Sequence, residues 1–232
     1  MTSALERRER YREPWRAPFE RRLEQLLRPG IRILDVGSGR NPTLPADRRP
    51  ADCRYVGLDL SAAELDRAPA GSYDERWVAD ITHHVPELDG RFDLVLSFQV
   101  LEHVKPLSAA FENFRGYLRP GGVFLGQFSG TFSFFGLANR VIPDRLTAWL
   151  VDRFTDRTAD SVFPASYDRC WDSAIRRIAR PWADVEVEPR YTGATYLRFL
   201  PPVQGAYLLY EDWALRSGKR DLATHYIVEA RR

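Results

Sequence analysis

A pair of glycines directly follows an apolar run and could bring the backbone close to a ligand. The run is Ile31–Val36, with Asp35 near its end, and the glycines are Gly37 and Gly39. Glycine allows a tight turn and leaves no side chain between the main chain and a bound group. A nicotinamide-cofactor fingerprint would have a third glycine where Pro42 stands and no acid at the position of Asp35. The pattern therefore opposes a nicotinamide dehydrogenase.

Two more aspartates end later apolar runs. Asp59 lies at the end of the second run, where a carboxylate can accept hydrogen bonds from both hydroxyls of a ribose. Asp80 ends the third run, and Ile81 follows it. The carboxylate could accept a hydrogen bond from the exocyclic amine of a purine, while the isoleucine packs on the face of the purine ring. Each acid alone could be a helix cap or a turn residue. Three acids at successive strand ends converge on one crevice, which favours a nucleoside site.

A parallel sheet is the element that would position these acids. Five short apolar runs alternate with helical patterns, and strands apolar throughout belong to a parallel sheet covered on both faces. The expected strands are residues 31–36, 55–60, 75–81, 92–98 and 123–128, with a helix over 106–118. Residues 4–28 are expected to be helical, with a break at Pro14. Beyond residue 128 we expect helices over 167–180 and 203–216, a strand over 183–189 and a last strand over 223–230.

These motifs, in this order and spacing, resemble the class I S-adenosylmethionine-dependent methyltransferases, in the broad small-molecule group. The resemblance covers residues 30–128 and is carried by ILDVGSG (33–39), VGLDLS (56–61), ADI (79–81), FDLVLS (92–97), VLEHV (100–104) and LRPGG (118–122). It implies an α/β, Rossmann-like doubly wound sheet of seven strands, mostly parallel with the last strand antiparallel, and helices on both faces. The final run, over residues 223–230, would be that antiparallel strand.

The resemblance also assigns roles to individual residues, with S-adenosyl-L-methionine as the cofactor. The methionine part would be held by the glycine turn, the ribose and adenine by the second and third strand ends, and the sulfur would lie near the end of the fourth strand. In that order the residues are Asp35, Gly37, Ser38 and Gly39; Asp59, Leu60, Asp80 and Ile81; and Ser97 and Phe98.

His103 is the candidate catalytic base, because it follows the fourth strand on the side where sulfur and acceptor should meet. The histidine of this motif can also cap or orient the following helix, so a structural role stays open. His83 and His84 are expected at the surface, and His225 in the last strand away from the methyl group. No carboxylates stand at a clear metal-ligand spacing, so no metal is expected.

The acceptor would enter over the carboxyl ends of the strands, beneath aromatic-rich segments. We expect one domain over 1–232: an N-terminal helical lid (1–29), a cofactor-binding core (30–128) and substrate-side insertions at 129–165 and 191–218. The aromatic residues in the lid and insertions would either line an apolar pocket or only pack the insertions down. The expected reaction is methyl transfer to a hydroxyl oxygen of a small apolar or aromatic acceptor from secondary metabolism. One alternative is methyl transfer to a carbon or nitrogen atom of a sugar, lipid-linked or natural-product substrate. The other is a partner protein that binds the cofactor but transfers no methyl group.

The overall composition excludes several other classes. The 232 residues are 44% hydrophobic, as in a globular protein, and 34 basic residues nearly balance 32 acidic ones. No basic stripe or Asn-Pro-Pro-Tyr-like motif points to a nucleic-acid substrate. The two cysteines, Cys53 and Cys170, suggest no disulfide framework, and the charged start resembles no signal peptide. A cytoplasmic protein without stable membrane insertion is expected; the oligomeric state stays open.

Overall fold

The fold was analysed in a computed structural model, which describes residues 8–133, 136 and 166–232. One seven-stranded sheet runs through the molecule in the order β3-β2-β1-β4-β5-β7-β6. The strands are β1 (Arg32–Val36), β2 (Arg54–Asp59), β3 (Glu75–Val78), β4 (Phe92–Phe98), β5 (Leu118–Ser129), β6 (Asp184–Arg190) and β7 (His225–Arg231). β7 is antiparallel to both of its neighbours, and β1 to β5 are parallel. The expected fold class, including the antiparallel last strand, is confirmed.

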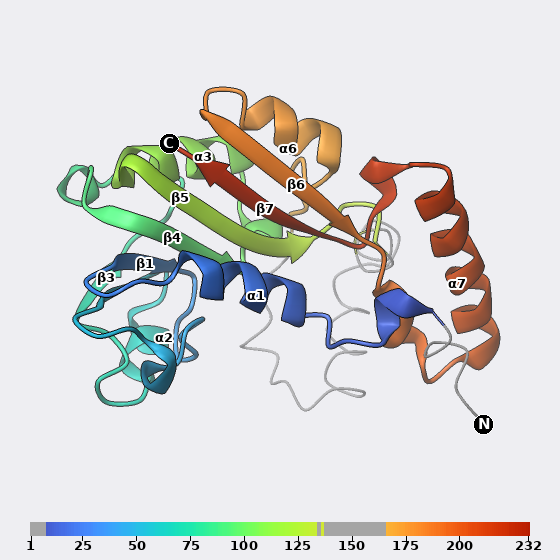
Figure 1. Cartoon of the computed structure of the whole chain (residues 1–232), viewed down its shortest axis with the longest axis horizontal. Coiled ribbons are helices and arrows are strands. Elements are labelled where there is room, and N and C mark those ends of the chain that lie inside the picture. Colours follow the sequence, from blue (N-terminus) through green and yellow to red (C-terminus); the bar gives the residue numbers. More distant parts are fainter. Residues whose placement is uncertain (1–7, 134–135, 137–165) are drawn as a thin grey trace.

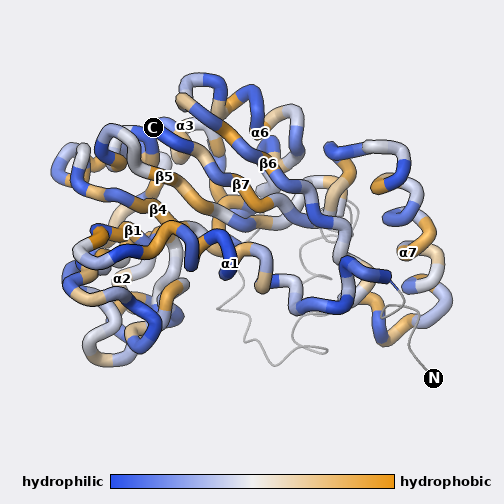
Figure 2. The backbone as a smooth tube through the Cα atoms, viewed as in Figure 1, coloured by the Kyte–Doolittle hydropathy of each residue, from blue (hydrophilic) through white to orange (hydrophobic). Residues whose placement is uncertain are grey.

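Helices cover both faces of the sheet (Figure 1). α1 (Ala17–Leu26) lies on one face, and its Phe19 and Leu23, one turn apart, are buried against strand residues such as Leu94. α3 (Leu107–Tyr117) and α6 (Asp172–Ile178) contribute to the core on the other face. Figure 2 shows hydrophobic residues concentrated along the central strands between these helices. The remaining α-helices are α2 (Ala62–Asp66) and α7 (Pro201–Arg216).

Short 3-10 turns fill several connections. They are η1 (Glu9–Tyr11), η2 (Ala46–Arg48), η3 (Pro86–Leu88), η4 (Leu101–His103), η6 (Gly193–Leu197) and η7 (Arg220–Leu222). The carboxyl ends of β4 and β5 point toward the end of the molecule where α7 lies (Figure 1). This edge of the sheet therefore faces η6, α7 and the N-terminal segment that precedes α1.

Three element boundaries differ from the expectation. Residues 4–7 of the N-terminal helix expected over 4–28 lie outside the described residues; from residue 8 onward the structure has η1 followed by α1, because Pro14 and Pro18 restrict regular helix to the residues after Arg16. The helix expected over 167–180 begins at Asp172, since Tyr167 and Arg169 have positive φ angles. β5 begins already at Leu118, but its register with β4 shifts between the pairs at Leu118 and Val123. Residues 119–122, in the LRPGG motif, therefore lie in a bulge or irregularity within β5.

Most of the 129–165 insertion lies outside the described residues, including Phe134, Phe135, Trp149 and Phe163. Phe132 is described, and its ring centroid lies 5.9 Å from that of Trp171. In the described part, no helix is both long and apolar enough to cross a bilayer.

Candidate functional site

The glycine turn after β1 has a backbone that only glycine fits. Gly37 has φ +74°, and a Cβ there would lie 2.5 Å from both methyl groups of Val100. Gly39 has φ +49°, and a Cβ there would lie 3.3 Å from Oδ2 of Asp59. A side chain at either position would crowd the turn or the carboxylate beside it. The turn therefore requires glycine at both positions, and it passes directly beside the Asp59 carboxylate.

Buried side chains beneath the turn hold it in place. Asp35 is fully buried, and its Oδ2 accepts hydrogen bonds from Thr43 N (2.7 Å) and the Tyr55 hydroxyl (2.6 Å). The Ser38 hydroxyl lies 2.5 Å from the Tyr73 hydroxyl, which donates to Gly39 O at 2.8 Å. Burial raises the pKa of Asp35, and the hydrogen bonds from Tyr55 and Thr43 oppose that rise. Asp35 thus anchors the turn through one oxygen, while its Oδ1 has no partner among the described residues.

The second and third strand ends present acids beside the turn. Asp59 is the last residue of β2, and its Oδ1 accepts from Ser61 N at 2.9 Å. Partial burial raises the pKa of Asp59, and the nearby Glu64 carboxylate contributes to the rise. The next side chain, Leu60, is 63% exposed beside Asp59 and is accessible to a ligand.

Asp80 lies two residues beyond the end of β3 rather than within it. Its Oδ1 accepts from the Thr82 amide and hydroxyl, each at 2.8 Å, and these bonds lower its pKa. Ile81 is buried, and its carbonyl accepts from the Asn113 amide at 2.7 Å. The strand ends early, but the aspartate and isoleucine are still held at the same edge of the sheet.

The end of β4 supplies two differently placed side chains. Ser97 is fully buried, and its hydroxyl has no hydrogen-bond partner in the described structure. The Phe98 ring lies on the opposite face of the strand, 5.3 Å from Trp15 and 5.0 Å from Phe19 between ring centroids. The Arg16 guanidinium lies 4.3 Å from the centre of the same ring. Phe98 therefore connects the N-terminal segment to the site edge.

His103 and Glu102 lie side by side in η4, directly after β4, but in different environments. His103 is exposed, whereas Glu102 is 5% exposed. Glu102 Oε1 accepts from Ser129 N at 3.4 Å, and Oε2 has no partner within the described residues. Burial raises the pKa of Glu102 to about 7. The sequence pointed to the histidine, but the glutamate is the buried titratable group here. That Glu102 Oε2 lacks a hydrogen-bond partner can be recognised only in the three-dimensional structure.

His225 lies in the last strand, as expected, and as the first residue of β7 it belongs to this edge of the sheet. Because β7 is antiparallel, its first residue pairs in register with Ser129 at the end of β5. The His225 ring stacks on Trp15 with centroids 5.5 Å apart, and its Nε2 lies 3.4 Å from the Tyr196 hydroxyl. Burial, together with the Arg190 charge, lowers the pKa of His225 to about 4. Because the last strand was expected to be antiparallel, its first residues could have been predicted to lie at the carboxyl edge of the sheet.

Unpaired buried polar atoms converge on this edge. Seven buried side-chain N or O atoms of the described residues have no hydrogen-bond partner, and five lie at or beside the carboxyl ends of β1, β4 and β5 or at the start of β7. The five are Asp35 Oδ1, Ser97 Oγ, Glu102 Oε2, Gln127 Oε1 and His225 Nδ1. Buried polar groups are normally satisfied by protein, water or ligand, so this cluster is a candidate place for a polar ligand. No group of His, Cys, Asp and Glu in the described ranges gathers into a metal site.

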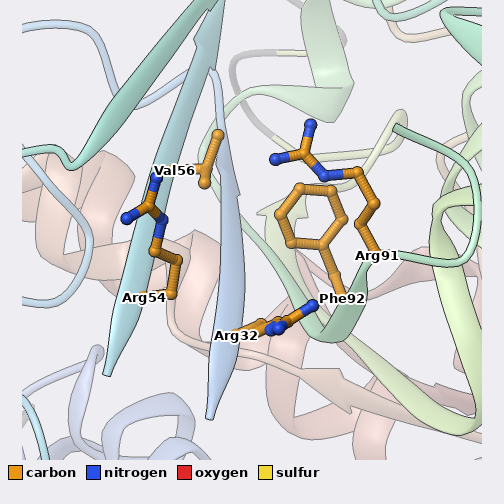
Figure 3. Close-up of a pocket in the computed structure, with 5 residues that line it drawn as sticks. All are labelled: Arg32, Arg54, Val56, Arg91 and Phe92. Carbon is orange, nitrogen blue, oxygen red and sulfur yellow. The ribbon is translucent and has the colours of Figure 1, made fainter. Parts of the chain in front are cut away.

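A different pocket lies at the opposite edge of the sheet. It is lined by Arg32, Arg54, Val56, Arg91 and Phe92, near the beginnings of β1, β2 and β4 (Figure 3). Arg91 forms an ion pair with Glu75 at 2.7 Å. None of the residues expected to hold a cofactor lines this pocket, so it is separate from the candidate site.

Comparisons with known proteins agree with this geometry. A family model described as a methyltransferase domain matches residues 7–172. A ubiquinone biosynthesis O-methyltransferase of Paramagnetospirillum magneticum is 38% identical over 110 residues, which span 44% of this chain and 43% of that protein. The corresponding enzyme of Brucella melitensis is 28% identical over 154 residues, 64% of this chain and 61% of that protein. The matches therefore span less than two thirds of these relatives.

Solved structures share the fold. A S-adenosylmethionine-dependent methyltransferase from Mesorhizobium loti is 23% identical and superposes with a TM-score of 0.51, covering 91% of this chain and 96% of that one. Phosphoethanolamine N-methyltransferase 2 of Haemonchus contortus, solved with S-adenosylhomocysteine, is 17% identical with a TM-score of 0.53, covering 93% and 52%. The family match over most of the chain, together with this fold, settles the classification. The chain belongs to the class I S-adenosylmethionine-dependent methyltransferases.

Proposed function

We propose that this protein transfers the methyl group of S-adenosylmethionine to a hydroxyl oxygen of a small apolar or aromatic acceptor of the natural-product type. The observation that carries the proposal is the cluster of five unpaired buried polar atoms at the carboxyl edge of the sheet. Two of the relatives are named as O-methyltransferases of ubiquinone biosynthesis, which supports a hydroxyl acceptor. The rings of Trp15, Phe98 and Tyr196 at the same edge support an apolar one.

The cofactor fits the residues present. The glycine turn and the unmet Asp35 oxygen suit the methionine part, Asp59 the ribose hydroxyls, and exposed Leu60 a face of the adenine. Asp80 and Ile81 would hold the far side of the adenine, with Ser97 and Phe98 nearest the sulfur. Bound there, S-adenosylmethionine supplies a methyl group on a sulfonium sulfur, ready for in-line displacement.

Titration calorimetry with S-adenosylmethionine and S-adenosylhomocysteine tests the cofactor site. Asp59→Ala is expected to weaken binding by about 1–3 kcal/mol, the value of a lost pair of hydrogen bonds to a charged acceptor. Asp184→Ala is the matched control, because Asp184 is exposed at the start of β6, on the opposite edge of the sheet. Absence of binding by folded protein, or equal weakening by both variants, would overturn the assignment.

His103 is proposed as the group that accepts the hydroxyl proton, because it follows β4 directly and its side chain reaches solvent. His103→Gln is expected to lower kcat about tenfold or more while the dissociation constant for S-adenosylmethionine stays unchanged. Unchanged kcat would assign His103 a structural role in η4.

Turnover distinguishes an enzyme from a cofactor-binding partner protein. The assay measures transfer of a labelled methyl group to catechols and phenols with and without an alkyl tail. Phosphoethanolamine belongs in the same panel, because a phosphoethanolamine N-methyltransferase of Arabidopsis thaliana is 35% identical over 102 residues. Methylation of phosphoethanolamine alone would replace the oxygen acceptor with a nitrogen one.

A further inference from the structure

The outward side of α7 is apolar, although a surface helix normally presents polar residues to solvent. Ala206, Leu209 and Trp213 are spaced by three and four residues and form one exposed stripe, with Leu209 68% and Trp213 51% exposed. Leu208, Glu211 and Ala214 form the opposite, buried face. Phe199 and Leu200, just before the helix, are exposed too and extend this apolar surface. We call Phe199, Leu200, Val203, Leu209 and Trp213 the α7 surface.

The acids of α7 are held on its inner side. Glu211 is 1% exposed and accepts from Gly193 N at 2.7 Å, from the Thr224 hydroxyl at 2.9 Å and from the Tyr11 hydroxyl. Asp212 is bound by the Arg8 and Arg10 guanidiniums at 2.6 and 2.7 Å. Neither carboxylate is therefore available to give the α7 surface negative charge.

The charged residues at the two ends of the α7 surface are cationic. Arg198 precedes the helix, and Arg216 and Lys219 follow its apolar stretch; all three are exposed. Arg216 also lines a groove beside α7 in which the N-terminal segment contributes both arginines and the acids Glu9 and Glu13. An exposed apolar stripe bordered by arginine and lysine is the pattern of a helix that lies in the surface of an anionic bilayer.

We propose that α7 docks this protein on an anionic lipid surface. A second copy is the less suitable occupant, because a two-fold axis brings cationic ends together whether it pairs the helices antiparallel or parallel. In the antiparallel pair Arg198 of one copy would approach Arg216 and Lys219 of the other, and in the parallel pair each cationic end would meet its own copy, with no outward acid on α7 to compensate. A lipid surface also accepts a projecting helix without a complementary groove, and α7 lies at one end of the molecule with no described element outside it (Figure 1).

Docking through α7 would bring the bilayer close to the candidate site. Glu211 on the inner face of α7 accepts from Thr224, the residue before His225. One helix therefore separates the α7 surface from the His225 imidazole, whose Nδ1 has no partner among the described residues. This narrows the acceptor to a hydroxylated molecule that partitions into lipid, a conclusion that rests on the proposed function.

Vesicle flotation of the full chain tests the docking. The probes are vesicles of phosphatidylcholine mixed with phosphatidylglycerol, and vesicles of phosphatidylcholine alone. Binding is expected to the mixed vesicles and to be weaker without the anionic lipid. The variant Leu209→Asp with Trp213→Asp is expected to lose at least about tenfold in partitioning, because each substitution removes a large apolar side chain from the contact. Val78→Asp, an exposed apolar residue on β3, is the matched control and is expected to float like the wild type.

Three outcomes would overturn the proposal: no flotation with anionic vesicles, flotation unaffected by the double variant, or a dimer in light scattering that only the double variant dissociates. The last result would assign the α7 surface to a second copy. Circular dichroism checks that each variant is folded. Calorimetry with S-adenosylhomocysteine in the same preparations shows whether the cofactor site is intact, so a failure of docking is distinguished from a failure of the proposed function.

Discussion

The Glu102→Gln variant is expected to gain about 3 kcal/mol in the free energy of unfolding, relative to the wild type, when the pH is raised from below 4.5 to above 7. Glu102 is buried in η4, and its carboxylate accepts from Ser129 N at 3.4 Å. Burial raises the pKa of the carboxyl from 4.5 to about 7, because the ionised form loses more hydration than its hydrogen bonds replace.

The direction of the pH effect follows from proton binding. Between 4.5 and about 7 the folded protein holds the Glu102 proton, while the unfolded chain has released it. Unfolding therefore releases a proton in this window, and the free energy of unfolding falls as pH rises through it. Glutamine has the same shape and cannot ionise, so the advantage of the variant grows across the window and is constant above it.

Denaturant unfolding of wild type and Glu102→Gln, followed by circular dichroism on both sides of the window, measures this difference. Glu112→Gln is the matched control, because Glu112 is exposed on the outer side of α3. A difference between wild type and Glu102→Gln that is the same at both pH values would show that the carboxylate is solvated in the folded protein. The same residue is a reason to record kcat against pH, since its charge changes near neutrality at the edge proposed to bind the acceptor.

The cofactor half of the fold could be predicted because its signals are local. Apolar runs alternate with helical patterns, and Gly37 stands where the structure requires φ +74° and close contact with Val100. Boundaries were less accurate where tertiary contacts override local preference. The helix expected from residue 167 begins at Asp172, because Tyr167 N donates to Glu102 O and Thr131 N donates to Cys170 O. No periodicity reveals those long-range hydrogen bonds.

The candidate site was only partly predictable for the same reason. Glu102 and His103 are adjacent in the sequence, and which of the two is buried depends on how η4 closes against β5. His225 is different, since the antiparallel direction expected for the last strand already brings its first residue to the carboxyl edge. The unpaired atoms become visible only when the strands are assembled, because each lacks a partner in three dimensions rather than in the sequence.

His225 predicts a second pH effect of about the same size and opposite sign. Burial and the Arg190 charge lower the pKa of His225 from 6.5 to about 4, so the unfolded chain binds a proton at pH values where the folded protein does not. The contribution of neutral His225 to the free energy of unfolding is fully present above pH 6.5. It is lost as the pH falls toward 4, by up to about 3 kcal/mol. His225→Gln removes this loss, because an amide can approach the Tyr196 hydroxyl but does not titrate.

Unfolding of His225→Gln and wild type across that range separates the histidine from Glu102, whose effect has the opposite direction. The variant is expected to gain on the wild type as the pH falls, whereas His84→Gln, which alters an exposed ring, should follow the wild type. If the stability curves of the variant and the wild type stay parallel, His225 is protonated in the folded protein and its Nδ1 donates a hydrogen bond. If they diverge as expected, His225 is uncharged in the folded protein. Its imidazole then stacks on Trp15 and keeps Nδ1 without a partner among the described residues, available to hydrogen-bond an acceptor hydroxyl.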